Sequence, residues 1–189
     1  ATNVAVGLAR LGLKVGCIAE VGKDVAGSVV LSDLQKEGVS TDLLVQEKSE
    51  ETGVSGLLIS KDGARTALVY RGAARLLSVS DVRWDALEVK WVHLSSVGNV
   101  DLINKTLEWC KEHRVQLSWN PGNWEISRIA LGELKPDWSA VSVLLVNRQE
   151  FGVMTGVEQT DGVWASDLKF DGPQVMVVTD GARGGKYCV

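Results

Sequence analysis

The chain has 189 residues, of which 45% are hydrophobic and 23% charged, and its net charge is −4. This length allows one domain with a proper core, and the composition is that of an ordinary globular protein. No run of Lys or Arg forms a basic stripe, which argues against nucleic acid as a partner. The longest apolar runs, such as SVLLV and VMVV, have the length of strands. A membrane-spanning helix needs about 20 apolar residues, so we expect no membrane segment.

The three cysteines, Cys17, Cys110 and Cys188, are far apart in the sequence and odd in number. Their spacing matches neither a disulfide framework nor a metal site, so we expect reduced, buried thiols in a cytoplasmic protein. The sequence opens with ATNVAVGLARLG, without Met and without a leading strand. We therefore expect the natural chain to extend beyond this sequence at both ends.

The first 38 residues predict two helices with a short buried strand, KVGCIAEVG, between them. The first helix lies in TNVAVGLARLG and ends at Gly12, where a C-terminal glycine cap belongs. Asp24 is placed to cap the second helix, VAGSVVLSDLQKEG, and Gly38 closes it. The helical period places Val4, Leu8 and Leu11 on one face of the first helix, and the apolar positions of the second helix include Val25, Val29 and Leu34.

A β-hairpin is predicted next, because TGVSGLLIS and ARTALVYRG are β-rich runs on either side of a Lys-Asp-Gly turn. In a chain that otherwise alternates strands and helices, such a hairpin is either a sheet edge or a flap. We expect a β lid inserted at about residues 52–73 of a single α/β domain that occupies residues 1–189.

Strands and helices then alternate regularly. The predicted strands are WVHLS, VQLSW, VLLV and VMVVT, and the predicted helices between them are DLINKTLEWCKEH, a short stretch after a Pro/Gly loop, and RQEFGVMTG. Continuous apolar strands that alternate with amphipathic helices predict a three-layer sandwich with a mostly parallel central sheet. Ligands of such sheets bind outside the carboxyl ends of the strands. The candidate segments therefore follow the strands, at 95–99, 120–124, 147–150 and 179–185.

Asn147 stands at the end of one predicted strand, with Glu150 three residues later. This spacing is typical of a helix capping box, which needs no ligand. The functional interpretation is that both side chains face a phosphate or a hydrated metal ion near the helix N-terminus, whose free N–H groups favour anions. The two interpretations are compatible with each other.

The segment TDGARGG places three glycines between two apolar strands. Glycine allows positive φ angles and lets the backbone approach a ligand, but it also forms ordinary tight turns, and the loop taken alone favours a turn. Neither the P-loop pattern nor a G-x-G-x-x-G between a strand and a helix is present.

The remaining candidates favour structural roles. The two tryptophans of SWNPGNW, Trp119 and Trp124, are interpreted as packing residues rather than as a sugar platform. His93 lies in an apolar strand and His113 at a helix end, and neither has a neighbouring nucleophile or metal ligand in the sequence. Asp24 and Asp180 are interpreted as cap and turn residues.

Five short segments, taken in order, resemble the ribokinase-like (PfkB) family of carbohydrate kinases. ATNVAVGLARLG is similar to the second half of the family's Gly-Gly-x-x-x-Asn stretch, and VGKDVAGSVVLSDLQKEGVST to its Gly-x-Asp-x-x-Gly segment. ETGVSGLLISKDGARTALVYRGA resembles the β lid that closes over the sugar. LLVNRQEFGVMTG matches the Asn-x-x-Glu segment, and VVTDGARGG matches the Thr-x-Gly-x-x-Gly loop. The resemblance extends over essentially the whole chain.

The resemblance implies an ATP-dependent kinase of a small sugar or sugar-like alcohol, with Mg²⁺ as the metal. It places Asn3, Gly72, Ala73 and Asn120 at the sugar. It also implies that Asn147 and Glu150 position the ATP phosphates and hydrated Mg²⁺, with Glu150 acting on the metal through water. Thr179, Gly181 and Gly184 would line the nucleotide site.

The same resemblance implies that the catalytic base is an aspartate in a Gly-Ala-Gly-Asp stretch, expected beyond Val189. The family's first strand and its sugar-binding aspartate are expected before Ala1. We therefore predict that these 189 residues do not catalyse phosphoryl transfer by themselves.

Departures from the family pattern leave the substrate open. Ser118, Asn120 and Gly122 stand where relatives that phosphorylate acidic sugars have Asp-x-Asn-x-Arg, so only the asparagine is retained, and Ala74 replaces a common lid asparagine. Tyr70 and Arg71 could bind the carboxylate of a sugar acid. The favoured interpretation is that these two residues are simply exposed on a lid strand. The alternative functions are a nucleoside kinase of the same fold and a non-catalytic sugar- or nucleotide-binding module. A Rossmann oxidoreductase is a distant fourth hypothesis.

A homodimer through the lid is a further hypothesis, because a lone hairpin is marginal in water and both lid strands carry apolar residues, namely Val54, Leu57, Ile59, Ala67 and Val69.

Overall fold

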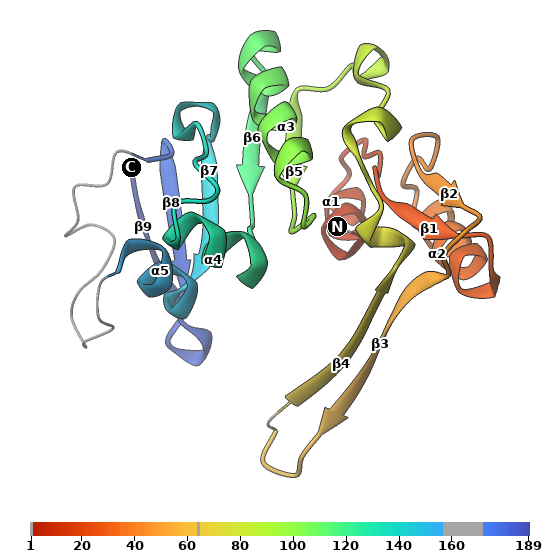
Figure 1. Ribbon diagram of the computed structural model, residues 1–189, viewed down its shortest axis with the longest axis horizontal. Helices are drawn as coiled ribbons and strands as arrows, with labels where there is room; N and C mark the ends of the chain where they lie inside the picture. Colours follow the sequence, from red (N-terminus) through yellow and green to blue (C-terminus); the bar gives the residue numbers. More distant parts are fainter. Residues whose placement is uncertain (1, 64, 157–171) are drawn as a thin grey trace. The chain divides into compact units, whose positions relative to one another are not determined.

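The computed structural model describes residues 2–63, 65–156 and 172–189 (Figure 1). The chain forms two compact units, Ala1–Arg83 and Trp84–Val189. The expectation of a single domain stays a prediction. Among the described residues, no helix combines the length and the apolar character needed to cross a membrane.

The first unit is built around a small parallel sheet. Its elements are α1 (Thr2–Arg10), β1 (Glu20–Gly22), α2 (Val25–Lys36) and β2 (Val45–Glu47), and β1 pairs with β2. The predicted caps are confirmed, since Asp24 accepts a hydrogen bond from the N–H of Gly27 and both Gly12 and Gly38 have positive φ angles. The strand predicted in KVGCIAEVG is shorter than expected. It begins only at Glu20, and Gly16 makes an isolated bridge to Ser40.

Most of the apolar positions named on these two helices are not buried. Leu11 is 79% exposed and Val25 is 82% exposed, whereas Leu34 is buried as its pattern indicates, together with Ala5. Ala5, Cys17, Leu34 and Val39 form the small core of this unit. Since the described sheet under these helices has only two strands, only a narrow stripe of each helix is covered.

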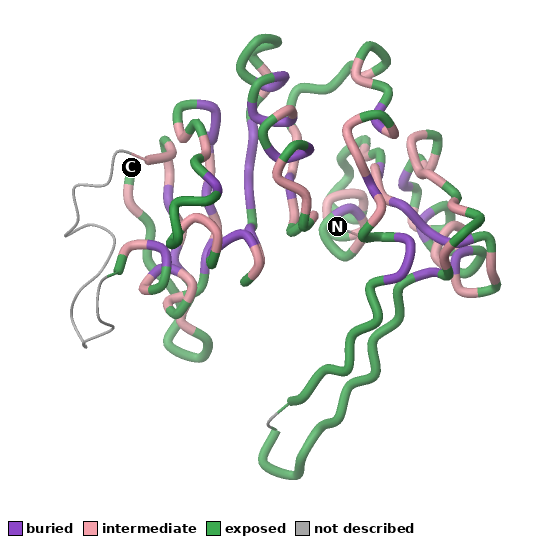
Figure 2. The backbone as a smooth tube through the Cα atoms, in the orientation of Figure 1, coloured by how far each residue is buried: buried purple, intermediate pink, exposed green. Residues whose placement is uncertain are grey.

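The predicted hairpin is present as β3 (Thr52–Ile59) and β4 (Arg65–Gly72), which pair antiparallel. Only Thr52 and Gly72, at its base, are buried, and Figure 2 shows the rest as exposed. The register separates two apolar faces: Val54, Leu58, Leu68 and Tyr70 lie on one, and Leu57, Ile59, Ala67 and Val69 on the other. The hairpin leads into two short 3-10 turns, η1 (Ala73–Arg75) and η2 (Val79–Asp81).

The second unit contains a five-stranded sheet in the order β5-β6-β7-β8-β9, parallel except for the last pair. Its fold class, α/β with a mostly parallel sheet, is confirmed. The strands are β5 (Trp91–Leu94), β6 (Gln116–Trp119), β7 (Val143–Asn147), β8 (Val175–Thr179) and β9 (Gly185–Cys188). The helices are α3 (Val100–His113), α4 (Asn123–Ala130) and α5 (Arg148–Thr155), with the 3-10 turns η3 (Trp84–Ala86), η4 (Trp138–Ala140) and η6 (Gly181–Arg183).

One face of this sheet carries the main core. Leu144 and Val146 of β7 and Met176 and Val178 of β8 are buried, and they belong to the same cluster as residues of α3, α4 and α5. The residues between them are only partly buried, which gives both strands an alternating pattern. The core therefore fixes which face of each strand is covered by the helices.

All three cysteines are free thiols, as expected. Cys17 and Cys110 are buried and Cys188 is half-buried. Burial raises the pKa of the Cys110 thiol to about 12. This thiol is therefore protonated and unreactive at neutral pH.

Glu20 of β1 is a buried carboxylic acid, 4% exposed, and its Oε2 atom has no partner among the described residues. Burial, followed by the charges of Asp81 and Glu47 and a hydrogen bond with Glu47, raises the pKa of Glu20 to about 7. The folded state therefore keeps a proton that the unfolded chain loses at lower pH. Stability should be greatest at acidic pH and fall as the pH rises through about 7.

We expect this fall to be on the order of 1–2 kcal/mol between about pH 5.5 and pH 8. Urea unfolding followed by circular dichroism at the two pH values measures it. Glu20→Gln should remove the difference by keeping the position neutral. An equal pH dependence in this variant would contradict the assignment to Glu20.

Candidate functional site

The carboxyl ends of β7 and β8 bring two of the predicted motifs together. Asn147 and Thr179, the last residues of these strands, are direct register partners in the parallel pair. Both residues are exposed. The Asn-x-x-Glu segment and the glycine loop, 32 positions apart in the sequence, therefore meet at one edge of the sheet.

Asn147 and Glu150 form the capping box that their spacing indicates. Asn147 Oδ1 accepts the N–H of Glu150 at 2.8 Å, and Glu150 Oε2 accepts the N–H of Asn147 at 2.8 Å. The structural interpretation is thus confirmed. The box also fixes both side chains at the N-terminus of α5, where the helix dipole favours an anion.

The glycine loop is the connection of the β8–β9 hairpin, so the turn interpretation is also confirmed. The N–H of Asp180 donates to the carbonyl of Gly184 at 2.7 Å, and Thr179 pairs with Gly185. Gly181 has a φ of 55° and Gly184 a φ of 83°, values that favour glycine. The loop therefore keeps a compact turn directly beside the capping box.

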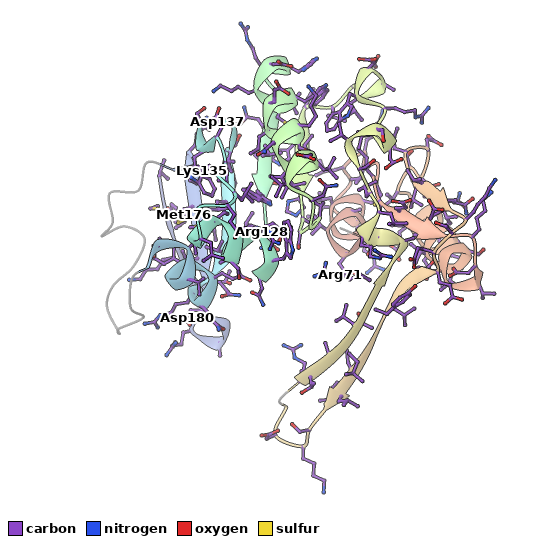
Figure 3. All side chains as sticks on the ribbon, viewed as in Figure 1. Arg71, Arg128, Lys135, Asp137, Met176 and Asp180 are labelled. Carbon is purple, nitrogen blue, oxygen red and sulfur yellow. The ribbon has the colours of Figure 1, made fainter. Side chains whose placement is uncertain are left out.

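A pocket of about 320 Å³ lies between these two segments. Its lining residues come from the start of α5 and from the glycine loop: Asn147, Arg148, Gln149, Thr179, Asp180, Gly181 and Arg183. Figure 3 labels Asp180 at this end of the second unit. Of the predicted nucleotide residues, Asn147, Thr179 and Gly181 line the pocket, whereas Glu150 and Gly184 support it through the bonds just described.

Three charged residues of this pocket were missed as site residues. Arg148 Nη1 donates to Asp180 Oδ2 at 3.2 Å, and Arg183 donates from Nε and Nη2 to the two oxygens of Asp180 at 2.8 and 2.9 Å. Hydrogen bonds from Arg183 and then from Arg148 lower the pKa of Asp180. Asp180 is therefore more than the turn residue predicted. The signal available in the sequence was that Arg148 and Arg183 lie within the two candidate motifs.

Gly72 and Ala73 lie at the base of the hairpin, where Gly72 ends β4 and Ala73 begins η1. Ala73 is fully buried and donates its N–H to the carbonyl of Glu51 at 2.8 Å. The other strand is anchored by Asp24, whose carboxylate accepts both the N–H and the hydroxyl of Thr52 at 2.7 Å. These hydrogen bonds, together with the one from Gly27, lower the pKa of Asp24. The cap of α2 thus also fixes the start of the hairpin.

The other predicted sugar residues belong to different units. Asn3 is exposed on α1 in the first unit. Asn120 follows β6 in the second unit, and its side-chain Nδ2 donates to the carbonyl of Leu145 at 2.8 Å. Asn120 therefore also ties the ends of β6 and β7 together.

The packing interpretation of the two tryptophans is confirmed. Trp119 is fully buried against Trp138, with ring centroids 5.9 Å apart, and Trp124 packs under the guanidinium of Arg128 at 3.8 Å (Figure 3 labels Arg128). His93 Nδ1 lies 2.9 Å from Ser118 Oγ. The Tyr70 hydroxyl donates to Glu50 at 2.8 Å.

Glu125 of α4 was not singled out from the sequence, yet its carboxylate organises a neighbouring loop. It is fully buried, and it accepts hydrogen bonds from the N–H groups of Val97, Gly98 and Gly122 and from the hydroxyl of Ser96. The available signal was a glutamate three residues after an N-cap glycine, a position from which a carboxylate can reach back to the N-cap N–H. Glu125 thereby holds the loop after β5 against the start of α4.

Among the described residues, no group of three or more His, Cys, Asp or Glu side chains has the arrangement of a metal site. Mg²⁺ keeps several waters and often binds through one or two carboxylates and a phosphate. Glu150, beside the pocket, fits that mode.

Comparison with known proteins decides the family. The family model "pfkB family carbohydrate kinase" matches residues 1–188. The chain belongs to the PfkB family of carbohydrate kinases. Relatives in this family include fructokinase-2 of Solanum lycopersicum, 26% identical over 98% of this chain, and ribokinase of Mus musculus, 25% identical over 96% of it. The chain spans 60% and 57% of these two relatives.

Solved PfkB-type structures share the fold. A PfkB protein from a Polaromonas species is 26% identical, with a TM-score of 0.79 over 98% of this chain and 67% of its own. A fructokinase from Xylella fastidiosa with bound ATP is 21% identical, with a TM-score of 0.74 over 100% of this chain and 66% of its own. The ribokinase-like fold predicted from the sequence is therefore confirmed.

Proposed function

We propose that the protein to which this chain belongs phosphorylates a small sugar or sugar-like alcohol with ATP. The observation that carries the proposal is the meeting of Asn147 and Thr179 at one edge of the sheet, beside a pocket lined by two arginines. Membership of the PfkB family supports the reaction class, and the fructokinase from Xylella fastidiosa has bound ATP. A cytoplasmic location is part of the proposal.

Phosphoryl transfer depends mainly on positioning and on stabilising charge. In our proposal, Asn147, Thr179, Gly181 and Gly184 shape the nucleotide site. Glu150 holds hydrated Mg²⁺ at the phosphates, and the ion when bound neutralises part of their charge. The capping box keeps Glu150 in place at the N-terminus of α5.

The acceptor side of the proposal uses the hairpin β3–β4 as a lid, with Asn3, Gly72, Ala73 and Asn120 as sugar-binding residues. The lid carries exposed apolar side chains on both faces, which supports a homodimer formed through it. Sedimentation of the natural polypeptide checks the dimer, and a monomer at micromolar concentration would contradict it. That these 189 residues lack activity by themselves stays a prediction.

The function is tested by offering the natural polypeptide containing this chain a panel of acceptors with ATP and Mg²⁺. The panel is fructose, ribose, ketodeoxygluconate and adenosine, and the readout is ADP release together with phosphorylated product. We expect transfer to at least one sugar, reduced at least tenfold in kcat by Glu150→Gln, because that variant weakens the hold on Mg²⁺. Transfer to adenosine alone would favour the nucleoside kinase. Nucleotide binding without any transfer would favour the non-catalytic module.

A further inference from the structure

The pocket beside α5 contains an arginine–aspartate–arginine group at positions that the Asn-x-x-Glu and Thr-x-Gly-x-x-Gly patterns leave unspecified. Arg148 is the first variable residue of one pattern, and Asp180 and Arg183 are variable residues of the other. All three line the pocket. The chain therefore supplies charges here that the motifs themselves do not require.

The three side chains differ in how tightly they are held. Arg148 and Asp180 have side chains only 13% and 10% exposed, whereas Arg183 is 67% exposed. Arg183 uses Nε and Nη2 on the carboxylate, a two-point contact that fixes the plane of its guanidinium. Asp180 Oδ2 thus accepts hydrogen bonds both from a nearly buried arginine and from a solvent-facing one.

The charge of this group favours an anion. Two guanidinium groups and one carboxylate leave one net positive charge in the pocket, next to the N-terminus of α5. A guanidinium has five N–H donors and matches the oxygens of a phosphate in two-point contacts. Gly181 adds no side chain to the pocket wall, so the backbone of the loop stays accessible to a ligand.

We propose that Arg148 and Arg183 bind the phosphate chain of the nucleotide and that Asp180 is a positioning residue that holds both guanidinium groups at the pocket. The nucleotide as ligand rests on the proposed function, whereas the binding of a phosphate chain rests on the geometry. The negative charge of Asp180 offsets the repulsion between the two guanidinium groups, which would otherwise turn toward solvent. The arginines are then ordered before the ligand arrives, which lowers the entropic cost of binding.

Calorimetric titration of the natural polypeptide with ATP, sodium tripolyphosphate and adenosine tests this proposal. Arg148→Gln and Arg183→Gln should each weaken binding of ATP and of tripolyphosphate by about tenfold or more. Adenosine, which has no phosphate, should bind these variants as it binds the unmodified protein. Lys135→Gln is the matched control, since it removes one exposed positive charge of the same unit outside the pocket, and Figure 3 shows Lys135 apart from Asp180. It should leave all three affinities unchanged.

Asp180→Asn should weaken ATP binding several-fold and leave adenosine binding unchanged. Stronger ATP binding by this variant would show that the carboxylate competes with phosphate and would overturn the positioning role. Arg183→Lys keeps the charge but loses the two-point contact, so it should recover only part of the affinity. Thermal melting by circular dichroism shows whether each variant is folded. If one arginine variant is unfolded, the variant of the other arginine provides the test.

The outcomes separate this inference from the proposed function. Unchanged tripolyphosphate affinity in both arginine variants, or no binding of tripolyphosphate to the unmodified protein, would overturn the inference even if sugar phosphorylation is found. Loss of tripolyphosphate binding in the variants would support the inference even if no acceptor is phosphorylated.

Discussion

Replacing Glu125 by alanine should lower the free energy of unfolding by roughly 3–5 kcal/mol, because four hydrogen-bond donors lose their acceptor at once. The donors are the backbone N–H groups of Val97, Gly98 and Gly122 and the hydroxyl of Ser96, at distances of 2.8–3.0 Å. Glu125 is fully buried, so water does not readily take over these bonds. Urea unfolding monitored by tryptophan fluorescence measures the change, since all the described tryptophans lie in the second unit.

Glu125→Gln separates the hydrogen bonds from the loss of volume. The amide keeps the size of the side chain but turns an N–H₂ group toward N–H donors, so we expect a smaller yet clear loss of roughly 2–3 kcal/mol. Glu88→Gln is the control, because Glu88 is exposed, and its effect should stay within about 0.5 kcal/mol. A Glu125→Gln variant as stable as the control would contradict the role of Glu125 in holding the loop after β5.

Gly72→Ala should have the second large effect, at the hinge of the hairpin β3–β4. Gly72 is buried with a φ of 50° and a ψ of −141°, a conformation that residues with a Cβ rarely adopt. A Cβ there would lie 2.1 Å from the carbonyl oxygen of Glu51 and 2.9 Å from the backbone nitrogen of Gly53. Since both neighbours are backbone atoms, the base of the hairpin must move, and we expect a loss of stability of roughly 2–4 kcal/mol.

Gly56→Ala provides the matched control for this hinge. Gly56 lies on β3 of the same hairpin, and a Cβ at that position meets nothing within 4 Å. This variant should therefore be close to neutral, and in the natural polypeptide it should keep the KM for the sugar, whereas Gly72→Ala should raise it. Equal stability and equal KM in the two variants would show that the geometry at Gly72 is not needed.

The sequence predicted best where a local pattern determines the structure. The succession of β5, β6, β7 and β8 along the chain, with the helices between them, followed from apolar runs alternating with amphipathic stretches. Asp24, Gly12 and Gly38 were recognised because caps depend on the two or three residues around them. The rule that ligands bind outside the carboxyl ends of the strands selected the segments of Asn147 and Thr179, which the structure brings together.

The failures have a common physical cause, because they depend on contacts between distant residues. Val25 and Val29 fit a helical period, but burial depends on what lies above the helix, and Val25 is 82% exposed. Asp180 looked like a turn residue because its pair with Arg148 joins positions 32 residues apart. Glu125 was overlooked because three of its four donors lie in a loop that precedes it by 27–29 residues.

The central claim is that the ends of β7 and β8 bind the phosphates of ATP, and hydrogen–deuterium exchange of the natural polypeptide with and without ATP and Mg²⁺ tests it most directly. The account predicts slower exchange at backbone amides of residues 147–156 and 179–185 when ATP is present, and a smaller effect with adenosine. Unchanged exchange in both segments, with protection only elsewhere in the protein, would contradict it.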